Sequence, residues 1–155
     1  MSIKRRTFIK GSAASGALLV ATSIGLLTPA QVLAAWPQKA FTATNMQDAL
    51  KALLDDTRME VGNITVKLPE TAEMGALVPI TVTSTLEDIE SISIFVAKNA
   101  QPLACSFDFK GDLQNYISTR IKMAQTSEVI VVVRADGDLY SATQTVNVIN
   151  GGCGG

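Results

Sequence analysis

Between residues 61 and 149 the chain has several short segments in which apolar and polar residues alternate with a period of two. This alternation is typical of β-strands with one buried face, so it restricts most of the chain to sheet structure. Strands this short and this evenly spaced predict an all-β fold, an immunoglobulin-like β-sandwich of about seven strands. The predicted strands centre on residues 64–68, 78–82, 92–96, 103–109, 116–123, 129–133 and 140–149.

Three local signals refine this prediction. Residues 129–133 are all apolar, which predicts a central strand of the sandwich. Residues 136–138, Asp-Gly-Asp, predict a tight hairpin turn, because Asp-Gly tolerates positive φ. Residues 69–75 are predicted to form a loop.

One helix is predicted before the strands, over about residues 45–56. Thr44 is the predicted cap, and Gln47 three residues later completes a capping box. Residues 36–43 are predicted to be a short lead-in segment. The apolar residues of the helix recur at helical spacing and would form one buried face: Met46, Ala49, Leu50, Leu53 and Leu54.

The last five residues place one thiol between two pairs of glycines: Gly151, Gly152, Cys153, Gly154 and Gly155. No packed element favours such a sequence, because glycine loses much backbone entropy on folding and brings no side-chain contacts. We therefore predict a flexible arm over residues 151–155. Extended, its span from Asn150 to Cys153 is about 10 Å, at ~3.3 Å per residue. The other interpretation is a frayed terminus with an incidental cysteine.

The beginning of the chain has the pattern of an export signal. Arg5 and Arg6 precede an aromatic residue and a lysine, and a moderately apolar stretch follows them. This pattern predicts a twin-arginine (Tat) signal peptide over residues 1–35, cleaved after Ala34 or Ala35, and hence a periplasmic protein. A spanning helix needs ~20 strongly apolar residues, and the apolar stretch of the signal is shorter and contains polar residues. No membrane span is therefore expected after cleavage.

Composition excludes several classes of function. Removal of residues 1–35 leaves 120 of the 155 residues, enough for one domain over residues 36–150. That removal takes four of the 13 basic residues and none of the 14 acidic ones, so the remainder has a net charge of −5 and no nucleic-acid partner is expected. Without histidine, Ser-His-Asp and Cys-His catalysis are excluded. We predict no catalytic residues, no metal and no cofactor.

The two cysteines are expected to differ. Cys105 is predicted to be a buried core residue on a strand face shared with Leu103, Phe107 and Phe109. The alternative is a Cys105–Cys153 disulfide, since an exported protein with an even cysteine count can form one. Cys153 has no cationic neighbour in the sequence, so its chemistry is expected to be switched on only inside a partner's active site.

The glycine-flanked Cys153, the Arg5-Arg6 signal and a single helix followed by a sandwich resemble the SoxY family, the substrate carriers of the bacterial Sox thiosulfate-oxidation system. The resemblance spans the full chain. It implies that Cys153 is the covalent attachment site and that catalysis belongs to partner proteins. It also implies a heterodimer with SoxZ, a second immunoglobulin-like protein that lacks a signal of its own.

The resemblance further implies a reaction cycle on Cys153. SoxAX, a haem enzyme, joins thiosulfate oxidatively to the thiol as a cysteine S-thiosulfonate. SoxB, a dimanganese hydrolase, releases sulfate and leaves a persulfide, which a sulfane dehydrogenase oxidises where one is present. A tethered carrier of this kind retains reactive intermediates and raises their local concentration.

Other functions also fit these residues. An exported structural or binding module would use Cys153 for an intermolecular disulfide. A SoxYZ-like carrier would serve another periplasmic dehydrogenase, with a substrate other than thiosulfate. An enzyme acting alone is the third alternative, and the absence of histidine argues against it.

Overall fold

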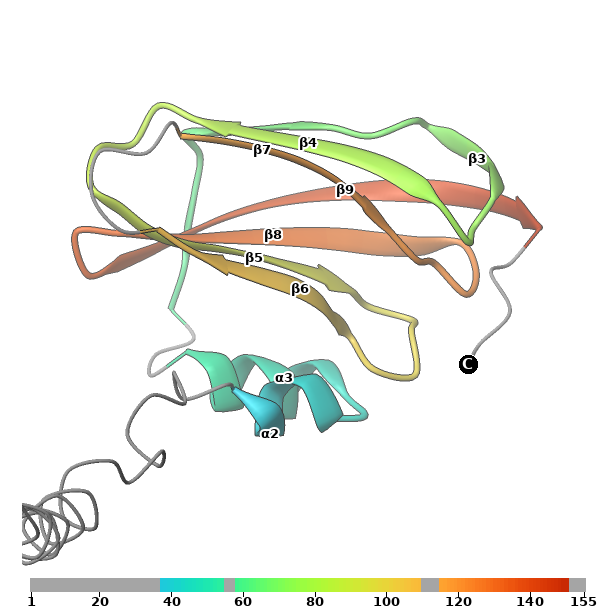
Figure 1. Cartoon of the computed structure of the whole chain (residues 1–155), viewed down its shortest axis with the longest axis horizontal. Helices are drawn as coiled ribbons and strands as arrows, with labels where there is room; N and C mark the ends of the chain where they lie inside the picture. The colour runs from blue at the N-terminus through green and yellow to red at the C-terminus, as the bar shows by residue number, and fades with distance from the viewer. Residues whose placement is uncertain (1–36, 55–57, 110–114, 151–155) are drawn as a thin grey trace, which may run out of the picture. The chain divides into compact units, whose positions relative to one another are not determined.

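The computed structural model describes residues 37–54, 58–109 and 115–150 (Figure 1). Within these ranges two short helices precede nine strands in two sheets. The smaller sheet has the order β2-β4-β7, and the larger has the order β1-β9-β8-β5-β6, with β3 also paired to β9. The strands are β1 Glu60–Val61, β2 Ile64–Lys67, β3 Thr71–Met74, β4 Val78–Ser84, β5 Ile89–Val96, β6 Leu103–Asp108, β7 Tyr116–Ile121, β8 Ser127–Ala135 and β9 Asp138–Asn150.

The two sheets pack face to face around the main core (Figure 1). The core side chains occupy alternate positions of the strands, as the period-two pattern requires. The predicted immunoglobulin-like sandwich is therefore confirmed, and its seven predicted strands correspond to β2 and β4 to β9. The contributions of β4, β5 and β8 are Val78, Ile80, Val82, Ile92, Ile94, Val96, Val129, Val131 and Val133.

Strand β8 is buried on both faces. Val129, Val131 and Val133 belong to the core between the sheets, whereas Val132 belongs to a second core with Ile130 packed against it. Strands β5 and β9 flank β8 on its two sides, so the continuous apolar run does form a central strand.

The second core joins the larger sheet to the helices α2, Gln38–Thr42, and α3, Met46–Leu53, which lie on the face turned away from the smaller sheet (Figure 1). Leu54, directly after α3, is buried there as well. The remaining buried residues of this core are Ala40, Ala49, Phe95, Leu103, Val132 and Leu139.

The helical region differs from the prediction in two ways. Helix α2 occupies the segment expected to be only a lead-in, because burial of Ala40 stabilises a helix too short to show a periodic pattern. Asn45, not Thr44, caps α3: its Oδ1 accepts from the Asp48 N–H at 2.9 Å, and its Nδ2 donates to the Asp48 carboxylate at 2.7 Å. The helix ends at Leu53, and residues 55–57 lie outside the described ranges.

The strand β3 was predicted to be part of a loop. Its sequence, Thr71-Ala72-Glu73-Met74, has one buried residue and no alternation of branched side chains. Backbone pairing with β9 holds it in place, with Ala72 opposite Val148 and Met74 opposite Asn150. A pairing made by the backbone leaves little trace in the side-chain pattern, which explains the error.

The predicted hairpin turn is confirmed. Asp136 and Gly137 both have positive φ, 50° and 79°, and they connect β8 to β9. The predicted signal peptide with Arg5 and Arg6, and the predicted arm over residues 151–155, lie outside the described residues. Within the described ranges no helix is long and apolar enough to cross a membrane.

Candidate functional site

The candidate site begins where β9 ends. This strand runs from Asp138 to Asn150, the residue directly before the five that contain Cys153. Strand β8 pairs with β9 only as far as Ser127 opposite Val146. Beyond that point β3 pairs with β9 in parallel up to Met74 opposite Asn150. The last four residues of β9 therefore remain part of the sheet.

Three hydrogen bonds hold the end of β9, and a fourth holds Gly75, which is bonded to Asn150. The Asn147 N–H donates to the Glu70 carbonyl at 2.9 Å, and the Val148 N–H donates to the Thr126 hydroxyl at 2.9 Å. The Gly75 N–H donates to the Asn150 carbonyl at 2.8 Å, and the Gly75 carbonyl accepts from the Met123 N–H at 2.7 Å. Asn150 is thus braced through β3 to the segment after β7.

The loops at the same end of the sandwich are also joined to each other. Asn99, in the β5–β6 turn, donates through Nδ2 to the Lys122 carbonyl at 2.7 Å and accepts at Oδ1 from the Ala124 N–H at 2.9 Å. The Lys98 N–H donates to the buried Ser127 hydroxyl at 3.0 Å. The end of β9 is therefore held by hydrogen bonds, and the loops around it are bonded to each other.

Cys105 lies in β6 as a half-buried free thiol packed against the main core. Burial raises its pKa to about 11, because desolvation disfavours the thiolate. The prediction is wrong in two respects: Cys105 is half-buried at the edge of the core and not fully buried, and Leu103 does not share its face, since Leu103 belongs to the core under the helices. The pairing with β5 shifts register between Ile94 and Phe95, and such an irregularity places Leu103 and Cys105 on opposite faces.

The sheet register separates Cys105 from the arm. Cys105 lies in one row with Ile94, Val131 and Ala142. Asn150 lies eight residues further along β9, about 26 Å at 3.3 Å per residue, and three strands across, about 14 Å at 4.8 Å per strand. The resulting separation of roughly 30 Å exceeds the ~10 Å reach of an arm from Asn150. The alternative of an intramolecular disulfide to Cys105 is therefore physically excluded.

A first prediction follows from the Cys105 pKa. At pH 7 a thiol with a pKa of about 11 is a thiolate in roughly one molecule in ten thousand, so iodoacetamide should modify Cys153 and spare Cys105 in the native protein. As pH rises towards 11, modification of Cys105 should increase. Peptide mapping after labelling at pH 7 and at pH 10 checks this, with urea-unfolded protein as the control. Equal labelling of both thiols at pH 7 would contradict it.

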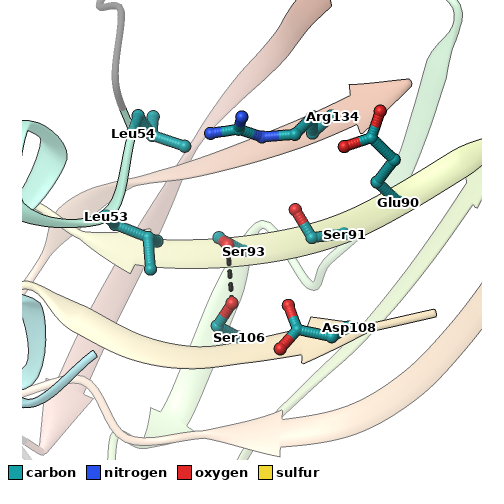
Figure 2. A pocket seen from close by; sticks show the side chains of 8 residues that line it. All are labelled: Leu53, Leu54, Glu90, Ser91, Ser93, Ser106, Asp108 and Arg134. Atoms are coloured by element: carbon teal, nitrogen blue, oxygen red, sulfur yellow. Dashed lines mark hydrogen bonds between the residues drawn. The ribbon is translucent and has the colours of Figure 1, made fainter. Parts of the chain in front are cut away.

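A groove of about 390 Å³ lies at the other end of the larger sheet, beside the end of α3 (Figure 2). The Ser93 and Ser106 hydroxyls form a hydrogen bond of 2.9 Å in it, and the Arg134 side chain extends along it towards Leu54 (Figure 2). Arg134 is paired with Leu139, eleven residues before the end of β9. The groove therefore lies about 36 Å from Asn150 along the strand.

Comparisons with known proteins point to one family. The family model described as Sulfur oxidation protein SoxY matches residues 50–153, more than half of the chain, and the match ends at Cys153. The solved structure of the sulfur carrier protein SoxY from Chlorobium limicola f thiosulfatophilum is 38% identical, with a TM-score of 0.60. That match covers 66% of this chain and 94% of that chain.

Other similar structures share the fold alone. Two structures of a superoxide reductase (neelaredoxin) from Ignicoccus hospitalis are each 12% identical, with TM-scores of 0.50. Each match covers 56% of this chain, and they cover 79% and 80% of those chains. None of the curated proteins matches the chain.

Proposed function

The chain belongs to the SoxY family of sulfur oxidation proteins, a carrier family, and on that premise we propose that it carries sulfur intermediates of thiosulfate oxidation covalently on Cys153. The observation that carries this proposal is the combination of a family match reaching Cys153 with a strand end braced three residues before it. The chain is a carrier in this proposal and not an enzyme.

The loading step on Cys153 is an oxidation. The Cys153 thiol and thiosulfate form one sulfur–sulfur bond, giving a cysteine S-thiosulfonate and releasing one proton and two electrons. The electrons pass to the haem enzyme SoxAX, because this chain contributes only the thiol. The sulfur atom must therefore enter a partner's active site, and the small glycines beside Cys153 let the arm enter a narrow channel.

The release step on Cys153 is a hydrolysis. Water attacks the terminal sulfone of the adduct, so that sulfate and one proton leave and a protonated persulfide, Cys–S–SH, remains on Cys153. The dimanganese hydrolase SoxB supplies this reaction, and a sulfane dehydrogenase, where present, oxidises the remaining sulfur. Because the intermediates stay attached to Cys153, they cannot diffuse away between enzymes.

The proposal includes export and a partner subunit. Residues 1–35, with Arg5 and Arg6, act as a twin-arginine signal that sends the protein to the periplasm. The twin-arginine route carries folded proteins, which suits export of this chain already bound to SoxZ. Deletion of the signal should retain both subunits in the cytoplasm, and independent export of the partner would contradict joint export.

The narrow-channel argument predicts the effect of bulk in the arm. Replacing Gly152 with leucine adds a branched side chain beside the carrier thiol, so processing by partner enzymes should fall by about a hundredfold, as expected for a displaced reacting atom. Thermal unfolding should not change, because the substitution lies beyond the last strand residue. Single-turnover loading of Cys153, followed by intact-mass measurement, gives the rate.

The matched control is Gly152→Ala, which adds one methyl group and should slow loading much less. A further control is the rate at which a small disulfide reagent modifies Cys153, which should be similar in all three proteins. Unchanged enzymatic loading in the Gly152→Leu protein would contradict the narrow-channel argument.

A further inference from the structure

Exposed apolar side chains are concentrated at the end of β9. Among the described residues, five large apolar side chains are strongly exposed, and three of them lie beside Asn150. These are Met74, 60% exposed, Leu77, 62% exposed, and Ile149, 67% exposed. We refer to these three residues as the collar. Single exposed apolar residues are ordinary on protein surfaces, whereas a group of them in one place is typical of a site that binds another molecule.

The backbone pairing places the collar around Asn150. Met74 is the partner of Asn150 in the β3–β9 pair, so the two side chains leave the sheet on the same face. Ile149 precedes Asn150 in the strand and therefore points to the opposite face. Leu77 lies in the turn after β3, two residues after Gly75, whose N–H donates to the Asn150 carbonyl. The collar thus flanks the arm's origin from both faces of the sheet.

The length of the arm brings any enzyme close to the collar. Two residues, Gly151 and Gly152, separate Asn150 from Cys153, so over three residue steps the chain reaches at most about 10 Å from the strand end. An enzyme that receives Cys153 in a recessed active site must therefore bring the rim of its channel against the residues around Asn150. Contact at the collar is a geometric consequence of the short tether.

We propose that the collar is the docking surface for the enzymes that process Cys153, and that it packs against an apolar rim around the entrance of their active-site channel. This inference rests on the function proposed above. Burial of the three side chains would add to the binding free energy that the glycine arm alone can provide. The arm has no side chain to recognise apart from Cys153.

The size and place of the collar favour a transient enzyme contact over a permanent one. A stable interface buries about 800 Å² on each partner, far more than three side chains provide. A permanent partner seated on the collar would also block access to Asn150 and hence to the arm. The heterodimer partner or a second copy of this chain is therefore expected to bind elsewhere.

The test compares a collar variant with a matched control in the processed chain bound to its partner subunit. The collar variant combines Met74→Gln, Leu77→Gln and Ile149→Thr. The control combines Val61→Thr and Tyr116→Gln, the other two exposed apolar positions. Val61 pairs with Ser141, nine residues and about 30 Å before Asn150, and Tyr116 lies at the far end of β7, opposite Thr83.

The readout is the loading of Cys153 with thiosulfate by the haem enzyme, over a range of carrier concentrations. The collar variant should show kcat/KM lower by about tenfold or more, mainly through a higher KM, whereas the control should match the unaltered protein. Modification of Cys153 by a small disulfide reagent, which needs no docking, should be equal in all three.

The outcomes separate this inference from the proposed function. If the unaltered protein is not loaded at all, the carrier proposal fails and the collar proposal with it. If it is loaded and the collar variant has the same kcat/KM, the collar proposal alone is overturned. If the variant loses its partner subunit, or changes self-association in sedimentation, the collar belongs to that interface and the proposal is overturned as well.

Discussion

Replacement of Cys153 by serine is expected to abolish sulfur loading completely. The serine hydroxyl cannot form the sulfur–sulfur bond that holds thiosulfate or a sulfane sulfur, so no adduct is retained between partner enzymes. The fold should be unaffected, because the substitution lies beyond β9, and the altered chain should still bind its partner subunit. Intact-mass measurement after incubation with thiosulfate and the loading enzyme gives the result directly.

The matched control is Cys105→Ala, which removes the other thiol. Cys105 is half-buried in β6, is held largely protonated at neutral pH by its raised pKa, and lies roughly 30 Å from Asn150. The Cys105→Ala protein should be loaded at the unaltered rate, with at most a small loss of stability. Persistent loading in the Cys153→Ser protein, or an adduct on Cys105, would contradict the assignment of the carrier thiol.

Replacement of Phe95 by alanine is expected to cost about 3–5 kcal/mol of unfolding free energy. Phe95 is fully buried on the face of β5 that packs against the helices, in one cluster with Ala40, Ala49 and Val132. Its removal leaves a cavity between the sheet and the helices that neighbouring side chains can fill only in part. Because small domains have only about 5–15 kcal/mol in total, the loss should be plain in urea unfolding.

The control for Phe95 is Tyr116→Ala, which removes an aromatic side chain that is half exposed at the end of β7. Its effect on unfolding free energy should stay within about 1 kcal/mol. A Phe95→Ala cost below about 1 kcal/mol would mean that the helices do not form a core with the sheet. That result would contradict the packing of the helices on the larger sheet, but it would leave the sandwich of two sheets unaffected.

The sandwich was predictable from the sequence because a strand with one buried face has alternating apolar and polar residues. Ile92, Ile94 and Val96 in β5 show that pattern and do lie in the core. The run at 129–133 lacks this alternation because β8 is buried on both faces. The smaller sheet covers one face and the helices cover the other.

Elements held by the backbone or by distant contacts were not predictable. Strand β3 depends on parallel pairing with β9, and α2 depends on burial of Ala40 against a sheet formed much later in the chain. The different faces of Leu103 and Cys105 depend on a register shift, which simple alternation cannot reveal. Each of these features requires knowledge of a partner segment that local sequence does not contain.

The proposed carrier residue could be predicted from the sequence, whereas the structure that supports it could not. Cys153 stands out in the sequence because glycines surround it, and the family match extends to that position. The bonds that hold the end of β9 involve Gly75, Thr126 and Met123, which belong to segments with no chemical signature of their own. Only the arrangement of β3 and the β7–β8 turn beside the end of β9 reveals their role.

The most direct test of the carrier account is intact-mass spectrometry of the protein purified from the periplasm, with and without thiosulfate and then after a reductant, with adducts mapped to the C-terminal peptide. The account predicts additions of thiosulfonate or sulfur that appear with thiosulfate, map to Cys153 and disappear on reduction. A mass that corresponds only to a disulfide between two copies of the chain, unchanged by thiosulfate, would contradict it and favour a structural role for Cys153.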